Sequence, residues 1–377
     1  MANNPVVILT IDGGGIRGII PAYVLTQFEK LTGKPCHQLF DIIGGTSTGG
    51  ILSAGLTTPN TQVSNFIPFT AAALLSIYQT LGSRIFVKQD IGESCADYYA
   101  DDGKGNGVEV FLQKIIGPTI TLSAAQKAVS SIKGNRVQQM FTTGYIVNSK
   151  GGTVKDPVQG ADYGPVLFNW KDAISNPLAC DYRVWEAARA TSAAPVYFPV
   201  AQVGGGVSPR SNTPEKWVVD GGTMSNNPAI WAFTEAFKLG AQRLSDITII
   251  SLGTGVYRGA NGVGIHTNAW PDYFDNGNWD SGPWMGDMDD LEGFNADGSL
   301  LTIILEAVQQ VSNSQLTALV KGGLNYYRLE PVITQCESAM DDITTPNISR
   351  LTDRAMSYVQ NEGKPVFDKV ISILKGL

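Results

Sequence analysis

The sequence predicts an α/β fold in which helices cover both faces of a mostly parallel central sheet, a three-layer α/β/α sandwich. Short apolar segments rich in β-branched residues alternate along the chain with segments whose apolar residues recur at helical spacing. Of the 377 residues, 43% are hydrophobic and 16% are charged, which suits a chain with a large buried core. Because no Pro-rich or highly charged linker divides the chain, we expect one domain over residues 1–377.

The first elements are the clearest. Val6–Ile11 is an apolar, β-branched run, which is typical of a strand buried on both faces. The glycine-rich loop Asp12–Gly18 follows it, and apolar residues then recur at helical spacing over 19–31. A second buried strand is expected at Leu39–Ile43, and it leads into a second glycine-rich segment, 44–50, ahead of another helix.

The same alternation continues through the rest of the chain. Further strands are expected at 139–147, 166–169, 216–219 and 247–252. Further helices are expected at 68–81, 108–116, 182–191, 229–239, 300–319 and 349–377. The part from 300 to 377 is therefore expected to be helical.

A candidate nucleophile lies in the second glycine-rich segment. Gly45-Thr-Ser-Thr-Gly49 fits the pattern G-x-S-x-G between a predicted strand and a predicted helix. Glycines on both sides of Ser47 let the backbone turn sharply enough to present the serine hydroxyl, and the following helix places positive partial charge beside it. This context predicts Ser47 as a nucleophile; the alternative is an ordinary glycine-rich turn.

The first glycine-rich loop fits G-x-G-x-x-G through Gly13, Gly15 and Gly18, and three functions compete for it. A phosphate-binding Walker loop fails, because Arg17-Gly18 stands where Gly-Lys-Ser/Thr is required. A dinucleotide site fits poorly, because the next strand ends in glycines rather than in an acid. An oxyanion hole fits best, since consecutive glycines expose backbone N–H groups at the sheet edge that carries Ser47. We expect Arg17 to fix this loop or to meet a phosphate.

The general base decides between two mechanisms. The chain has two histidines, His37 and His266, and the order Ser47…Asp220…His266 matches that of an α/β-hydrolase triad, which stays open. Asp220 follows a predicted strand and precedes two glycines, so its carboxylate can approach a serine hydroxyl closely. Burial that raises its pKa above about 3.9 would make it a better base. The alternative for Asp220 is an aspartate in a glycine-rich turn.

Three motifs together resemble patatin-like phospholipases. They are Asp12-Gly-Gly-Gly-Ile-Arg-Gly18, Gly45-Thr-Ser-Thr-Gly49 and Asp220-Gly-Gly222. The likeness runs in order over roughly residues 6–255 and includes Ser251-Leu-Gly-Thr-Gly255. The third motif departs slightly, ending in Gly222 where plant members often have Ala.

The resemblance implies a patatin-like fold and a Ser-Asp dyad. Ser47 is then the nucleophile and Asp220 the proton acceptor, with no metal and no cofactor. The implied reaction is hydrolysis of fatty-acyl esters of phospholipids or related glycerolipids through an acyl-serine. An oxyanion hole is expected from Gly13, Gly14, Gly15 and Thr48, with supporting roles for Arg17, Gly18, Gly45, Gly49, Gly221 and Gly222. The alternatives are an esterase that uses His266 and a non-catalytic storage or nucleotide-binding protein.

Charge and hydropathy indicate which kinds of partner and which cellular compartment we expect for this protein. A net charge of −7 does not attract nucleic acid. The N-terminus lacks a signal-peptide pattern, and no stretch approaches the ~20 apolar residues that span a bilayer. We therefore expect a cytoplasmic protein with peripheral membrane contact to its lipid substrate; the oligomeric state stays open.

Residues 256–299 break the alternation of strands and helices. This segment holds eight acids and one base, so its charge of −7 equals that of the whole chain, and it contains Trp270, Trp279 and Trp284. Irregular segments of this length are uncommon in compact domains and are usually functional. We expect an insertion that acts as a lid or interface element over the Ser47 pocket.

Overall fold

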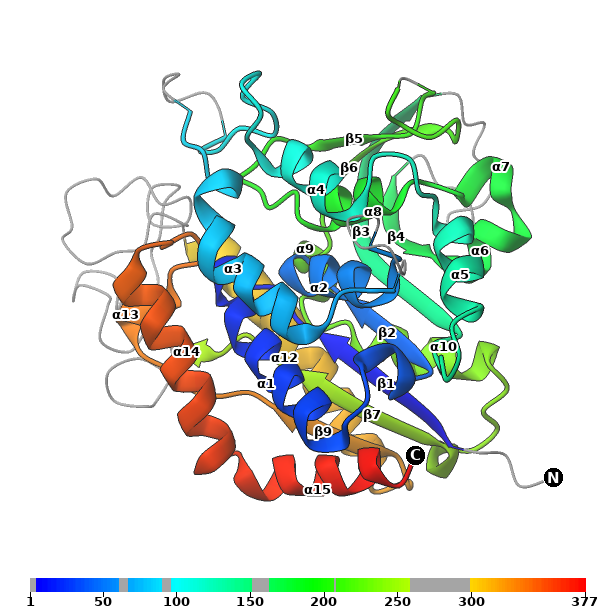
Figure 1. The fold of residues 1–377 in the computed structure, drawn as a ribbon, viewed down its shortest axis with the longest axis vertical. Helices are drawn as coiled ribbons and strands as arrows, with labels where there is room; N and C mark the ends of the chain where they lie inside the picture. The colour runs from blue at the N-terminus through cyan, green and yellow to red at the C-terminus, as the bar shows by residue number, and fades with distance from the viewer. Residues whose placement is uncertain (1–4, 61–66, 90–95, 151–162, 207, 258–298) are drawn as a thin grey trace, which may run out of the picture.

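The computed structural model describes residues 5–60, 67–89, 96–150, 163–206, 208–257 and 299–377 (Figure 1). Within these residues, eight strands form one sheet in the order β5-β6-β3-β2-β1-β7-β9, with β4 paired to β3. The strands are β1 (Val6–Ile11), β2 (Ile42–Gly45), β3 (Gln139–Lys150), β4 (Gly164–Asn169), β5 (Ala201–Val203), β6 (Glu215–Asp220), β7 (Ile247–Leu252) and β9 (Asn325–Leu329).

The sheet is mostly parallel, as predicted. β1 pairs in parallel with β2 and β7, β2 with β3, and β7 with β9. The antiparallel pairs β3–β4, β3–β6 and β5–β6 gather at one side. Because β1 and β2 run together and Ile11 is level with Gly45, the two glycine-rich loops leave the sheet side by side.

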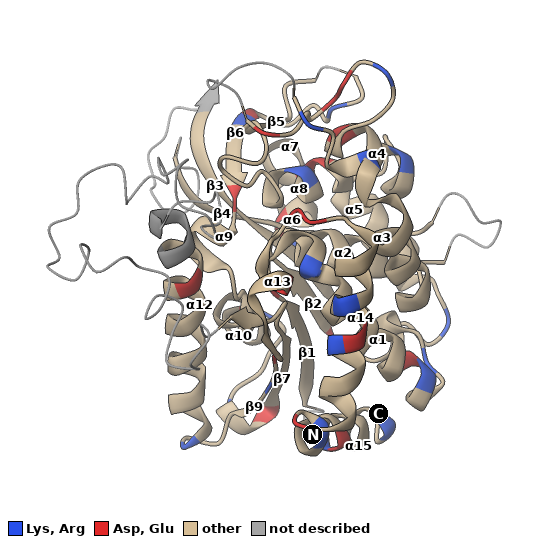
Figure 2. Ribbon diagram, turned by 90° about the vertical axis from the view of Figure 1, so that its left-hand side faces the viewer, with Lys and Arg blue, Asp and Glu red and all other residues tan. Residues whose placement is uncertain are grey.

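Helices cover both faces of the sheet and make the predicted three layers, seen edge-on in Figure 2. One face packs against α1, α2, α3, α4, α8, α14 and α15, and the other packs against α10 and α12. Alternate residues of β1 serve the two faces: Val7, Leu9 and Ile11 join the larger cluster, and Val6 and Ile8 join the smaller one. This two-sided burial explains the unbroken apolar run of the first strand.

The helix bounds are as follows. On the larger face lie α1 (Ile19–Thr32), α2 (Thr48–Thr57), α3 (Ala71–Ile85), α4 (Val108–Ile116), α8 (Val184–Thr191), α14 (Thr345–Gln360) and α15 (Lys364–Lys375). The remaining helices are α5 (Leu122–Ser130), α6 (Trp170–Ser175), α7 (Pro177–Cys180), α9 (Gly222–Ser225), α10 (Ala229–Lys238), α12 (Ser299–Val320) and α13 (Gln335–Ser338), with short 3₁₀ turns η1 (Gly15–Gly18), η2 (Cys36–Gln38) and η3 (Leu244–Asp246).

Several predicted elements need correction. The single helix expected over 349–377 is wrong, because α14 ends at Gln360 and α15 begins at Lys364 with a proline in its first turn. The second strand begins at Ile42 rather than Leu39, since η2 precedes it. α5 and β9 were not predicted; the partly buried sequence of β9, Asn-Tyr-Tyr-Arg-Leu, lacks the apolar run of the other parallel strands.

The acidic segment begins inside the described part of the chain. Its first residues form β8 (Val256–Tyr257), which pairs in parallel with β10 (Val332–Ile333). Trp270, Trp279, Trp284 and the rest of residues 258–298 lie outside the described residues, so the lid prediction stays a prediction. Among the helices the structure describes, none is long and apolar enough to cross a membrane.

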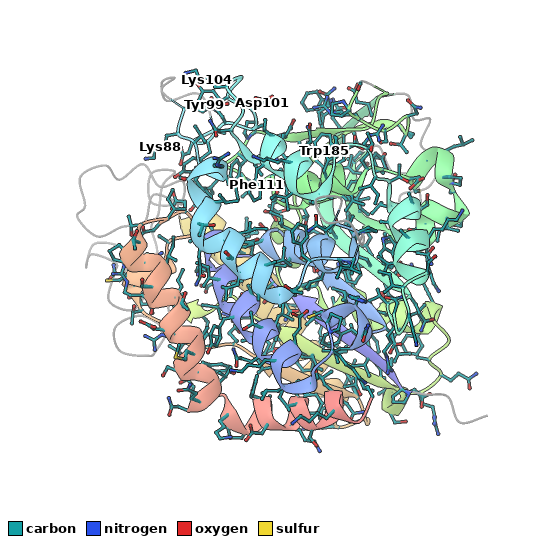
Figure 3. The ribbon with its side chains drawn as sticks, in the orientation of Figure 1. Lys88, Tyr99, Asp101, Lys104, Phe111 and Trp185 are labelled. Atoms are coloured by element: carbon teal, nitrogen blue, oxygen red, sulfur yellow. The ribbon has the colours of Figure 1, made fainter. Side chains whose placement is uncertain are left out.

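Lys, Arg, Asp and Glu colour scattered short stretches of the described ribbon, on helices as well as in loops (Figure 2). In the side-chain view, Phe111 of α4 and Trp185 of α8 lie within the body of the molecule (Figure 3). Lys88, Tyr99, Asp101 and Lys104 lie instead along its upper margin.

Candidate active site

Ser47 occupies a sharp turn between β2 and α2. Its φ of 54° and ψ of −125° are unusual for a residue with a side chain, and such strain persists only where the surroundings enforce it. The Ser47 N–H donates to the Thr191 hydroxyl over 2.9 Å, and the Ser47 carbonyl accepts from the Ile51 N–H over 3.1 Å. Ser47 is therefore the N-cap of α2, with its side chain at the positive end of that helix.

The glycines that flank Ser47 allow the turn to close. A Cβ at Gly49 would lie 2.1 Å from the carbonyl oxygen of Ile11, and a Cβ at Gly45 would lie 2.1 Å from the backbone of Gly49. The side chain between them, Thr46, fastens the turn to its neighbours: its hydroxyl lies 2.7 Å from that of Thr143 and donates to the Ser225 carbonyl over 2.7 Å. The two glycines of the G-x-S-x-G pattern are thus required by close backbone contacts.

Asp220 is the last residue of β6 and lies beside Ser47. Its carboxyl group is buried and accepts hydrogen bonds from the Ser47 side chain and from the Gly222 N–H, the latter over 2.7 Å. Burial raises its pKa from 3.8 to about 7, while the bonds from Ser47 and Gly222 and the charge of Arg189 lower it. Asp220 therefore changes protonation near neutral pH.

The loop after β1 approaches Ser47 from the neighbouring strand. Gly15 has φ 57°, and a Cβ there would lie 2.0 Å from the Met340 carbonyl oxygen, so the position requires glycine. The loop carbonyls are held: Gly13 O accepts from the Thr254 hydroxyl over 2.6 Å, and Gly14 O accepts from the Arg17 N–H over 3.1 Å. Gly14 and Gly15 line the same cavity as Ser47.

Gly13 differs from its two neighbours. Its N–H donates to the Asn226 carbonyl over 3.2 Å, so that donor is engaged within the protein, and a Cβ there would lie 2.3 Å from Asn226 Oδ1. Gly13 therefore serves close packing between the loop and the turn after α9. The other predicted supporting residues lie around the site, with Arg17 in the cavity lining and Gly221 against Thr143.

An ion pair beneath the glycine-rich loop was missed from the sequence. Asp12 is fully buried, and Arg328 of β9 donates to both of its carboxylate oxygens, over 2.9 and 2.5 Å. Arg328 also pairs with Glu330 at 2.9 Å and donates to Ser251 Oγ over 2.8 Å. Because 316 residues separate Asp12 from Arg328, no local pattern identifies this pair.

A second missed contact lies at the residue after the nucleophile. The hydroxyl groups of Thr48 and Tyr78 form a short hydrogen bond, and the Tyr78 hydroxyl lies 3.2 Å from the Thr48 carbonyl oxygen. Burial raises the pKa of Tyr78 well above its usual value, so the phenol stays protonated. A Cβ at Gly18 would lie 2.3 Å from Thr48 Oγ1, which explains that glycine. Tyr78 thereby fixes the first turn of α2.

One cavity joins these groups. Ser47, Thr48, Asp220, Gly14, Gly15 and Arg17 all line it. Its apolar wall comes from α2, α3, α4 and the loop after α8, and includes Ile51, Ile85, Phe86, Val108, Ala194, Tyr197 and Phe198. A serine hydroxyl that donates to a buried carboxyl beside an apolar wall suits attack on an ester whose acyl part is a hydrocarbon chain.

The two histidines lie differently with respect to this cavity. His37 belongs to η2, which precedes β2, so it lies toward the opposite end of that strand from Ser47 and outside the described lining. His266 lies outside the described residues, so the triad stays untested. Within the described part of the chain, no three His, Cys, Asp or Glu side chains gather to hold a metal ion.

The comparisons with known proteins agree on one family. The model of the patatin-like phospholipases matches residues 9–233. The chain is 28% identical to calcium-independent phospholipase A2-gamma of Mus musculus over 374 residues, which cover 97% of this chain and 40% of that protein. It is 29% identical to patatin group J-1 of Solanum tuberosum over 369 residues, which cover 92% of this chain and 81% of that protein.

Coverage differs among the relatives. The chain spans 40% of the length of the mouse relative, so the matched part of that larger protein is what is shared. Patatin-12 of Solanum tuberosum is 30% identical over 271 residues, 66% of this chain and 60% of that protein. Among solved structures, the crystal structure of VipD from Legionella pneumophila aligns over 94% of this chain and 67% of the VipD chain, with 10% identity and a TM-score of 0.36.

Proposed function

The chain belongs to the patatin-like phospholipase family, and on that premise we propose that it is a lipid acyl hydrolase with a Ser47–Asp220 dyad. Its substrates are fatty-acyl esters of phospholipids or related glycerolipids, and the reaction passes through an acyl-serine. The observation that carries the proposal is the hydrogen bond from the Ser47 side chain to the buried Asp220 carboxyl inside an apolar-walled cavity. The names of the patatin and phospholipase relatives support the same substrate class.

Acylation begins with proton transfer. The Ser47 hydroxyl gives its proton to the Asp220 carboxylate as Oγ attacks the ester carbonyl carbon. A pKa of about 7 makes Asp220 a stronger base than an exposed carboxylate, while leaving it ionised in mildly alkaline solution. When the tetrahedral intermediate collapses, the lipid alcohol leaves with the proton from Asp220. A water molecule then gives a proton to Asp220 and attacks the acyl carbon. The bond to Ser47 Oγ breaks, Ser47 recovers the proton from Asp220, and the fatty acid is released.

Backbone donors stabilise the oxyanion in this scheme. The first residues of a helix carry N–H groups with no intrahelical acceptor, and Thr48 begins α2 beside Ser47. The glycine-rich loop contributes Gly14 and Gly15, whereas the engaged N–H of Gly13 leaves it a packing role. Removing one such donor from an enzyme of this kind costs about 3 to 4 kcal/mol in the transition state. The Thr48–Tyr78 hydrogen bond supports this arrangement by holding the first turn of α2.

The decisive test is fatty-acid release from phospholipid vesicles by four proteins: wild type, Ser47→Ala, Asp220→Asn and His266→Ala. The dyad predicts loss of release in the first two variants and full release in the third. Loss of release in a His266→Ala variant that still folds would favour the triad instead. Full release by Ser47→Ala would refute the proposal, and a wild type that hydrolyses no lipid while folding normally would favour a storage or nucleotide-binding protein.

A further inference from the structure

The cavity that contains Ser47 has two chemically different walls. The apolar wall comes largely from α3, α4 and the loop after α8. The polar wall comes from η1, α12 and the turn after α9, and presents Arg17, Asn226, Glu306 and Gln309 together with the apolar Ile16 and Leu305. α12 lies on the opposite side of the sheet from α3 and α4 (Figure 2), and residues of all three helices line the cavity, so the two walls come from opposite sides of the sheet. An acyl chain on the apolar wall therefore leaves the polar wall to the head group.

Three charged side chains belong to the described lining: Arg17, Asp220 and Glu306. Asp220 is engaged with Ser47. Glu306 is half-buried on α12, and its pKa is raised to about 7 by burial, with the charge of Arg17 lowering it and that of Glu330 raising it. At pH 8 the wall therefore carries both a guanidinium and a carboxylate.

Among the described residues, two other acids near this wall, Asp12 and Glu330, are paired within the protein. Arg328 holds Asp12 and Glu330 together, with its Nη2 2.5 Å and 2.9 Å from their respective carboxylates. Gln309 donates to Glu330 over 2.6 Å as well. Glu330 is therefore committed to Arg328 and Gln309, and Glu306 is the acid on this wall that borders the cavity itself.

We propose that Glu306 is a head-group selector that favours phospholipids whose head group bears an ammonium over phospholipids whose head group is anionic. This inference rests on the proposed function, because it assigns the head group to the wall opposite the acyl chain. Every phospholipid carries the phosphate that the positive charge of Arg17 attracts, so Arg17 does not separate the two classes. The carboxylate does, since it attracts a choline or ethanolamine ammonium and gives an anionic head group no such partner.

The expected discrimination is about tenfold in kcat/KM at pH 8, because charges a few ångströms apart in a partly buried site interact much more strongly than in water. Replacement of Glu306 by glutamine removes the charge and keeps the shape. Glu362→Gln is the matched control. Glu362 is exposed and follows α14, and its replacement by glutamine makes the same change in net charge.

The experiment uses one vesicle population that contains phosphatidylcholine and phosphatidylglycerol with identical acyl chains, in equal amounts. Competition within one surface removes any effect of membrane docking, and mass spectrometry of the two lysolipids gives the ratio directly. That ratio does not depend on the fraction of enzyme that is folded. We expect wild type and Glu362→Gln to favour phosphatidylcholine about tenfold, and Glu306→Gln to bring the ratio close to one.

Two results would overturn the inference while leaving the hydrolase in place. One is hydrolysis of both lipids by wild type at equal rates; the other is a wild-type preference that Glu306→Gln leaves unchanged. Absence of hydrolysis of either lipid by wild type would instead overturn the proposed function, and the head-group assignment with it.

Discussion

Replacing Asp220 by asparagine should stabilise the fold while abolishing activity, and the gain should grow with pH. Folding moves the Asp220 pKa from 3.8 to about 7, so the folded state binds this proton more tightly than the unfolded state. The contribution of the protonated carboxyl group to the free energy of unfolding is therefore complete below pH 3.8 and is lost as pH rises through 7. Asparagine cannot ionise, so the variant does not lose stability in this way. Three pKa units correspond to about 4 kcal/mol, which is the upper limit of the gain at pH 8.

The measurement is urea unfolding of wild type and Asp220→Asn at pH 4, 6 and 8. Asparagine keeps the acceptor oxygen for the Gly222 N–H, and the difference between the two proteins cancels every other titrating group. The variant should gain up to about 4 kcal/mol over wild type between pH 4 and pH 8. Asp353→Asn, at an exposed position on α14, is the matched control for the substitution itself. A flat difference across this range would refute the view that Asp220 is held as a costly buried base.

The remaining predictions concern the frame around the dyad. Tyr78→Phe leaves the buried Thr48 hydroxyl without this partner, so it should lower kcat up to about tenfold and the unfolding free energy by about 1 to 3 kcal/mol; unchanged kcat would show that Tyr78 does not position α2. Gly49→Ala places a Cβ 2.1 Å from a β1 carbonyl oxygen and should lower the unfolding free energy by about 3 kcal/mol, measured by urea unfolding; wild-type stability would contradict the close contact. Arg328→Met leaves Asp12 buried without its cation and should destabilise the protein at pH 8 by about 3 to 5 kcal/mol, again by urea unfolding, and a smaller loss than 1 kcal/mol would show that water reaches this pair.

The sequence predicted those parts of the site that are encoded locally. Ser47 was identifiable because a strand, a serine between glycines and a helix follow one another within a few residues, and the structure keeps that order. Asp220 was identifiable because it ends a strand before two glycines. The sheet was predictable from its buried strands, since β1 and β7 are apolar on both faces.

Most of the features that were missed depend on contacts between segments that are distant in the sequence. Arg328 and Glu306 lie in the last quarter of the chain, and nothing in their neighbourhoods marks them as partners of Asp12 or of the cavity. The break between α14 and α15 did leave a local trace, because Pro365 follows Gly363 closely and a proline suits the first turn of a new helix. The engagement of the Gly13 N–H by Asn226 required the folded turn after α9.

Activation of Ser47 by Asp220 is open to a direct chemical test. Reaction with a fluorophosphonate, followed by peptide mass spectrometry, tests it most directly because it reports the modified residue rather than a downstream product. We expect modification at Ser47 in wild type and in His266→Ala, and strongly reduced modification in Asp220→Asn. Modification at another serine, or equal labelling of Ser47 in wild type and Asp220→Asn, would contradict it.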